Sequence, residues 1–413
     1  MTIIGVDFGM HRHTFRTLAF VLLSGAVVYP AQRGATADDP VQSLVSRLDL
    51  ERYKATIKGL TAFGDRREGT DRNRAAVDWI EAQLKSDGCT NTERITYDFQ
   101  PRPPAPRAPG APEPLATGAV GPQTFSASGG GRPRGIRVGT GVNTDPMKQP
   151  DVKLRTLNMQ PSAPGTRQEV YCTKVGTSHP DEMYIVAAHM DGHGWGEAAN
   201  DDGSGTALVM ELARVFNSPD VRTDRSIRFA LWNNEETGLN GSAAYVDQRK
   251  ELQGKETPPG SGRYPEPRWL GLIQHDMMLF DHGAPNADGT MSKRQRPEAD
   301  VNVEFQQNSK LAAESQALGW VLERANEKYA THYPVSIGSH MTNTDSSSFM
   351  DVVPSISVRE NQRGTEIGSG WDPQWHQPTD VFSTYNDDDF RLGLNAAQTT
   401  LAAVAQLVGA SMH

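Results

Sequence analysis

Imidazole and carboxylate side chains follow short apolar segments at several separated points of this sequence. These groups can bind a divalent cation, and each can also accept or donate a proton during catalysis. They occur as His189-Met190-Asp191, Asn200-Asp201-Asp202, Glu235-Glu236, His275-Asp276 and Trp375-His376. If the apolar segments are strands of one sheet, the polar residues that follow them gather at one rim.

Each of these patterns is unspecific by itself. A His-x-Asp triplet is common, paired glutamates usually form a solvated helix face, and Asn-Asp-Asp-Gly is typical of a turn that caps a helix. The recurrence after separate apolar segments is more informative, because clustered negative charge is unfavourable unless cations offset it. Imidazole and carboxylate without thiolate suit zinc or a similar divalent ion in an open, catalytic site.

The apolar segments themselves predict strands over residues 169–175, 183–188, 226–232, 269–274 and 355–358. Helical periodicity over 206–216, 310–329 and about 389–408 alternates with them. Short buried strands alternating with helices indicate a parallel sheet covered on both faces. The predicted fold is therefore α/β, a three-layer α/β/α sandwich with a central mixed, mostly parallel sheet.

The first part of the chain adds helices and then an irregular segment. Apolar spacing predicts helices between residues 41 and 84, and residues 92–99 alternate like a strand. Residues 101–135 contain nine prolines and seven glycines and can contribute little packed core. We expect one domain over 38–413, with a Pro/Gly-rich surface insertion at about 100–165.

The polar motifs occur in an order that resembles a known family. They read Ala188-His189-Met190-Asp191, Ala199–Gly205, Asn234–Leu239, His275-Asp276 and Trp375–Asp380. Together they resemble the M28 zinc peptidases, the co-catalytic aminopeptidase group. The resemblance extends from about Val41 to the end, apart from the proline-rich segment and loops near 255–265 and 285–297.

The resemblance implies two zinc ions in one site. One ion would be held by His189, Asp201 and Asp276. The other would be held by Glu236, His376 and the same Asp201, whose carboxylate would bridge the pair. Other divalent ions would also suit these ligands.

The resemblance also implies catalytic roles for two acids. Asp191 would orient His189 and so fix its tautomer and basicity. Glu235 would be the general base that takes a proton from water and returns it to the leaving amine. The implied activity is that of an exopeptidase, most simply an aminopeptidase acting on peptides.

One position departs from the family pattern, and three alternatives remain. A tyrosine that holds the substrate oxyanion is expected shortly before Asp345, where this chain offers His340 and no tyrosine. A surface histidine is the favoured interpretation of His340, and a substitute for the tyrosine is the alternative. A carboxypeptidase-like enzyme, a glutaminyl-cyclase-like enzyme with a single zinc, and a non-catalytic receptor use the same scaffold. The last two fit less well, because every ligand position and the base are present.

Composition and the N-terminus bear on partners and compartment. The chain has 41 basic and 50 acidic residues, a net charge of −9, which argues against a nucleic-acid partner. Arg12 and Arg16 precede an apolar run over 18–28 and then Ala35-Thr36-Ala37, which predicts a signal peptide over 1–37. An N-terminal helix or an uncleaved anchor is the alternative. We expect an exported protein, periplasmic or extracellular, with no stable membrane insertion after cleavage.

The cysteine count leaves one question open. Cys89 and Cys172 are the only cysteines, so they can form one bridge in an oxidising compartment or remain two free thiols. The sequence does not choose between these.

Overall fold

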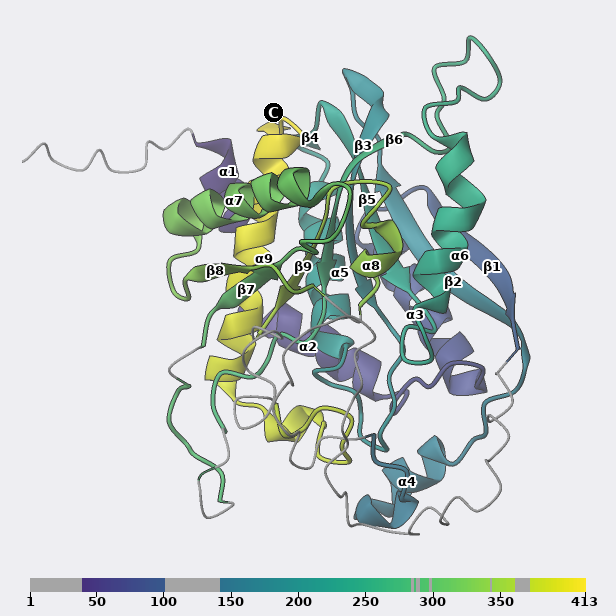
Figure 1. Cartoon of the computed structure of the whole chain (residues 1–413), viewed down its shortest axis with the longest axis vertical. Coiled ribbons are helices and arrows are strands. Elements are labelled where there is room, and N and C mark those ends of the chain that lie inside the picture. The colour runs from purple at the N-terminus through teal and green to yellow at the C-terminus, as the bar shows by residue number, and fades with distance from the viewer. Residues whose placement is uncertain are drawn as a thin grey trace, which may run out of the picture. The chain divides into compact units, whose positions relative to one another are not determined.

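The computed structural model describes residues 39–100, 142–283, 286, 290–296, 299–341, 344–360 and 372–413. An eight-stranded sheet with the order β1-β2-β5-β3-β6-β9-β7-β8 forms its centre (Figure 1). The strands are β1 (Thr92–Phe99), β2 (Gly165–Lys174), β3 (His179–His189), β5 (Arg225–Trp232), β6 (Arg268–His275), β7 (Val301–Glu304), β8 (Val335–Gly338) and β9 (Ser355–Arg359). Strands β4 (Val221–Arg222) and β10 (Ser411–Met412) form a separate pair.

The middle of the sheet is parallel and its sides are mixed. Strand β3 runs parallel to β5 and β6, and β6 runs parallel to β9. Antiparallel pairing occurs between β1 and β2, between β2 and β5, and between β7 and β9. The predicted mixed α/β sheet is confirmed, although β7 and β8, only four residues each, were not predicted from the sequence.

Helices cover the sheet as the alternation of strands and helices predicts. Helices α5 (Gly203–Phe216) and α3 (Asp71–Ser86) pack on the strands. Helices α2 (Leu50–Thr61) and α9 (Asp387–Leu407) lie beside α5, and α1 (Pro40–Val45) packs against α9. Helices α6 (Asn240–Arg249) and α8 (Ser346–Phe349) form a second group, and α7 (Ala312–Tyr329) packs against α9 and strands β7–β9. Figure 1 shows α6 beside β1 and β2, and α7 beside β7 and β8.

Strand β3 explains why the sequence there is almost continuously apolar. Ile185 and Ala187 belong to one buried cluster, whereas Val186 and Ala188 belong to the other. Successive residues of a strand point to opposite faces, so a strand covered on both faces needs apolar residues throughout. The run ends at His189, the last residue of β3, where the buried surface gives way to polar side chains.

A disulfide joins Cys89, just after α3, to Cys172 on β2. The bridge spans 83 residues of sequence, with the two Cα atoms 6.2 Å apart. It decides the question that the sequence left open, because the described residues contain no free cysteine.

Two regions singled out in the sequence fall outside the described residues. They are the proposed signal peptide and residues 101–141, which hold the proline-rich segment. The part of the expected insertion that is described contains a 3₁₀ turn at Pro146–Lys148 and helix α4 at Val152–Asn158. None of the helices in the described part of the chain has the length and apolar character that a membrane span requires.

Candidate metal centre

Acidic and imidazole side chains meet in a cavity of about 170 Å³ at the carboxyl ends of β3, β5 and β6. This is the rim where sites form in open α/β sheets. Its wall is made by His189, Asp201, Glu235, Glu236, Gly238, Leu239, Asp276, Trp375 and His376. All five side chains expected to bind metal, together with Glu235, therefore lie in one place.

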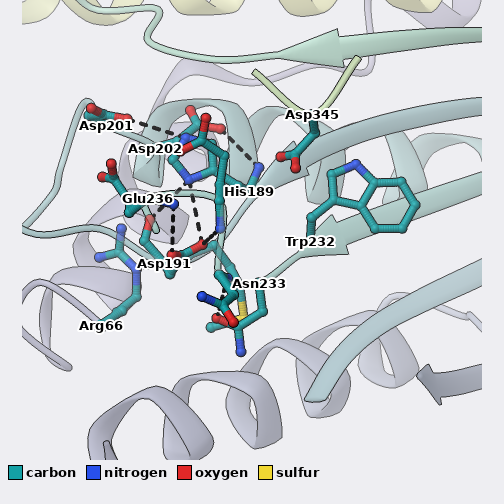
Figure 2. Close-up of polar contacts among 12 residues, drawn as sticks. Arg66, His189, Asp191, Asp201, Asp202, Trp232, Asn233, Glu236 and Asp345 are labelled. Atoms are coloured by element: carbon teal, nitrogen blue, oxygen red, sulfur yellow. Dashed lines mark hydrogen bonds and ion pairs between the residues drawn. The ribbon is translucent and has the colours of Figure 1, made fainter. Parts of the chain in front are cut away.

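One group of potential ligands surrounds His189 at the end of β3. Its Nε2 atom lies 3.3 Å from Asp201 Oδ1 and 3.7 Å from Asp276 Oδ1. Asp276 directly follows β6, and its other oxygen forms an ion pair with the buried Arg359 on β9. Figure 2 shows His189 between Asp201 and Asp191.

A second group lies on the other side of the same Asp201 carboxylate. His376 Nε2 is 2.9 Å from Asp201 Oδ2 and 3.0 Å from Glu236 Oε2. Ligands in a tetrahedral zinc shell, with bonds of about 2.0–2.1 Å, lie about 3.3 Å apart. The spacing of both groups is thus close to that of a coordination shell, and Asp201 directs one oxygen toward each.

The two glutamates share the cavity because β5 has already ended. It stops at Trp232, and Asn234 has a φ of 67°, in the left-handed region, so the chain turns before Glu235. The main-chain N–H groups of Glu235 and Glu236 donate to Asp191 Oδ1 and Oδ2, at 3.1 and 3.3 Å. Asp191 thereby fixes the loop that carries both glutamates.

The contact between Asp191 and His189 differs in detail from the expected one. His189 Nδ1 lies 3.1 Å from the main-chain oxygen of Asp191 and 3.7 Å from its carboxylate. The carbonyl is the nearer partner, and it favours the tautomer with hydrogen on Nδ1, which leaves Nε2 available as a ligand.

Two further buried acids, Asp202 and Asp380, hold the backbone around the candidate ligands, a role that the sequence analysis did not assign to them. Asp202 accepts hydrogen bonds from the main-chain N–H groups of His189, Gly205 and Met277, and so links β3, α5 and the residues after β6. Asp380 accepts from the main chain of Asp201 at 3.1 Å. Carboxylates of this kind orient ligands without binding metal themselves.

The electrostatics of the two histidines reflect the acids around them. Burial by itself would lower the pKa of His189, but the carboxylates around it, Glu235 foremost, raise that pKa well above its usual value. Burial opposes the same effect at His376, whose pKa is raised to about 9, chiefly by Glu236 and Asp201. The site therefore strongly favours positive charge next to these rings.

The pKa values of the acids in the site shift in different directions. Burial raises the pKa of Glu236 to about 7, and it raises the pKa of Glu235 well above the usual range. Burial would also raise the pKa of Asp201, but His189 and His376 hold it well below the usual value. The Arg359 guanidinium overcomes burial at Asp276 and lowers its pKa.

The donor set fits a pair of divalent cations. The ligands are imidazole and carboxylate only, the chemistry that suits zinc in catalytic sites. Glu236 Oε1 and His376 Nδ1 are buried with no hydrogen-bond partner among the described residues. Several carboxylates converge on a volume whose described lining residues include no lysine or arginine, so bound cations would offset charge that is otherwise costly to bury.

Sequence reasoning missed one member of the cluster, His193. Its Nε2 atom lies 3.1 Å from Glu236 Oε2, and its ring meets that of His376 edge-on with centroids 4.0 Å apart. The only signal in the sequence is its position four residues after His189, between two glycines. His340, by contrast, is not among the residues that line the cavity.

A comparison with protein-family models matches residues 169–400 to the model described as peptidase family M28. The matched region begins in β2 and ends in α9, so it contains every proposed ligand.

Similar proteins agree with this match but cover limited segments. Aminopeptidase YwaD of Bacillus subtilis is 37% identical over 125 residues, which are 30% of this chain and 26% of that protein. Carboxypeptidase Q of Xenopus laevis is 32% identical over 77 residues, 19% of this chain and 16% of that protein. The alignments thus span only about a quarter of the first relative and a sixth of the second.

Among solved structures, a zinc aminopeptidase from Bacillus subtilis has a similar fold. The TM-score is 0.57 with 16% sequence identity, and the match covers 87% of this chain and 95% of that one. At this level of identity the likeness establishes the fold.

Proposed function

The chain belongs to peptidase family M28, and from that membership we propose that it is an exported two-zinc aminopeptidase, which removes N-terminal residues from peptides. The observation that carries the proposal is the bridging position of Asp201. One oxygen faces His189 and the other faces His376, so one carboxylate serves two groups of ligands.

The protein residues divide the work as follows. His189, Asp201 and Asp276 would hold one cation, and Glu236, His376 and Asp201 the other. When bound, the two cations would acidify a water molecule and polarise the scissile carbonyl. Asp191 would fix the position of both glutamates through their main-chain N–H groups.

Glu235 would be the general base. It lines the cavity beside the ligands but makes no contact that assigns it to either group. Burial raises its pKa, so its carboxylate is a stronger base than a solvated one. It would take the proton of the attacking water and deliver it to the leaving amine.

The names of the relatives support an exopeptidase but differ in the end of the peptide at which the enzyme acts. YwaD and a probable lipoprotein of Mycobacterium tuberculosis are named aminopeptidases, whereas carboxypeptidase Q is named for the other end of the peptide. The longest of these alignments is with YwaD, which favours the aminopeptidase.

The test is an assay of the purified protein with three substrate classes. Amino-acid p-nitroanilides should be hydrolysed, a chelator should abolish the hydrolysis, and added Zn²⁺ should restore it. Cleavage of N-blocked dipeptides alone would indicate a carboxypeptidase, and cyclisation of N-terminal glutamine a cyclase. A protein that binds zinc but turns over none of these would match the receptor alternative.

Export is supported by the disulfide, because structural disulfides persist mainly in oxidising compartments. N-terminal sequencing of the protein recovered from an exporting host should begin at Asp38. An N-terminus that still carries the apolar run over 18–28 would contradict cleavage.

A further inference from the structure

His193 lies within the second group of ligands, although the motifs that placed the other residues do not include it. Three donor atoms, His193 Nε2, Glu236 Oε2 and His376 Nε2, lie near enough to one another to hold a single ion. The contacts to Glu236 are 3.1 Å from His193 and 3.0 Å from His376.

The orientation of the His193 ring is better suited to a shared ion than to a direct contact. Its Nε2 atom is buried within hydrogen-bond distance of Glu236 Oε2, yet it forms no hydrogen bond with any described residue. Two ligands of one cation behave in this way, because their lone pairs point at a common third position. A buried nitrogen with no such partner would carry an uncompensated desolvation cost.

The loop that carries His193 is held close to His376 by its glycines. A Cβ atom on Gly194 would come within 2.4 Å of the main chain of His376, and one on Gly192 within 2.4 Å of the Ala198 side chain. Gly194 also has a φ of 95°, which side chains rarely adopt. Both flanking positions therefore need glycine for the loop to lie where it does.

The described part of the expected insertion fixes the same loop from the outside. Gln149 Nε2 donates to the main-chain oxygens of Trp195 and Pro378, at 2.8 and 2.9 Å. Asn158 Nδ2 donates to the oxygen of Gly196 at 2.8 Å, and the main-chain N–H of Asn143 donates to that of His376 at 3.0 Å. These bonds join the His193 and His376 loops into one unit.

Arg66 holds the loop from the inside. It is fully buried, and its guanidinium donates to the main-chain oxygens of Met190 and Ala198, both at 2.7 Å. The ends of the His193 loop are thus fixed before any ligand arrives, which is the preorganisation that a binding site requires.

We propose that His193 is an additional ligand of the metal ion bound by Glu236 and His376, so that this ion has four protein ligands including the bridging Asp201. His193 does not line the cavity. It would hold the ion from within the protein and leave the cavity side open to water and substrate. The inference rests on the proposed two-metal function, and it adds a residue to one metal position.

The test is a titration of chelator-treated protein with Zn²⁺, followed by calorimetry. The wild-type protein should bind two ions, and His193→Ala should weaken one of the two binding events by at least about 10- to 100-fold while the other is unchanged. His179→Ala is the matched control, because His179 is an exposed histidine at the first residue of β3, the strand that precedes the His193 loop, and so lies at the far end from the site.

His193→Gln separates ligation from simple positioning. A glutamine amide can hydrogen-bond Glu236, so it should restore binding if His193 only positions that carboxylate, and should not if His193 binds the ion. Equal zinc affinity in His193→Ala and wild type, or full rescue by glutamine, would overturn the proposal.

X-ray absorption of the wild-type protein with two zinc ions covers the case in which the variants do not fold. We expect three imidazole ligands per pair of ions, from His189, His193 and His376. A count of two would overturn the role of His193 alone. Binding of a single ion, or of none, would instead contradict the two-metal function.

Discussion

Two groups of charged side chains are buried against the central sheet, and they differ in how their charges are compensated. In the Arg228 cluster on β5, Arg228 pairs with Glu266 at 2.5 Å and donates to Thr173 Oγ1 at 3.1 Å. Glu266 in turn accepts from Tyr245 at 2.7 Å and from Trp269 at 2.5 Å. Each charged group there has partners of its own within the protein.

The candidate metal centre is built in the opposite way. Its acids outnumber its positive groups, and buried atoms such as Glu236 Oε1 and His376 Nδ1 have no hydrogen-bond partner among the described residues. Burial raises the pKa of Glu236 to about 7, which expresses the cost of one more negative charge in this site. A buried cluster that satisfies itself stabilises the fold, whereas one left open is suited to bind something else.

The largest effect should be on turnover, from substitution of Glu235, the proposed base in the candidate metal centre. We expect Glu235→Gln to lower turnover by about 10²–10⁴-fold, because the amide cannot accept the proton of the attacking water. Its zinc content, measured by elemental analysis, should stay at the wild-type level. A variant that has lost zinc would show that Glu235 is a ligand, and the division of roles between the two glutamates would be wrong.

A substitution in the Arg228 cluster should lower the stability of the protein and leave metal binding unchanged. Arg228→Met leaves Glu266 buried without its cation, so the free energy of unfolding should fall by about 3–5 kcal/mol. Chemical denaturation measures this, and zinc affinity should be unchanged.

The double variant Arg228→Met/Glu266→Gln is the control for that interpretation. It removes both charges, so it should recover part of the lost stability. If the double variant is less stable than Arg228→Met by a further similar amount, the cost lies in packing and not in the unpaired charge.

The disulfide next to the Arg228 cluster should contribute a comparable amount to the free energy of unfolding. Cys172 lies on β2 between Tyr171 and Thr173, both of which contact Arg228. We expect Cys89→Ala/Cys172→Ala to lower the free energy of unfolding by about 2–5 kcal/mol, because the bridge restricts a long loop in the unfolded chain. Zinc binding should persist, and its loss would show that β2 and the metal centre are coupled.

The sequence predicted those parts of the site that follow from strand ends. Buried strands covered on both faces are mostly apolar, so His189 stands out as the polar residue that ends β3, and Asp276 as the acid that directly follows β6. The position of Glu235 and Glu236 after β5 follows for the same reason. Their metal-binding and catalytic roles came from the family resemblance and stay predictions.

What the sequence did not predict depends on contacts between distant segments. His193 reads as an ordinary glycine-flanked loop residue until Gln149 and Asn143 fix that loop beside His376. The disulfide could not be predicted because two cysteines allow either state until α3 and β2 are seen to be neighbours. Strands β7 and β8 are too short to show a period.

The smallest effect should come from a third group of charged side chains, near the surface, where water solvates and screens the charges. Glu81 on α3 contacts Lys85 at 2.7 Å and Arg94 at 2.5 Å, and Lys85 foremost, together with Arg94, lowers the pKa of Glu81 from 4.5 to about 2. A carboxyl whose pKa is lowered by folding stabilises the fold fully at pH values above its pKa in the unfolded chain. That contribution is lost as the pH falls toward its pKa in the folded protein. Glu81→Gln should therefore cost no more than about 1 kcal/mol near neutral pH, given screening by water. The difference from wild type in chemical denaturation should shrink steadily below pH 4.5.

Glu327→Gln, at an exposed glutamate that forms no ion pair with another described residue, should show no such trend. A difference for Glu81 that grows on acidification would mean that its carboxyl is stabilised in the protonated form, and the surface group would then resemble the candidate metal centre.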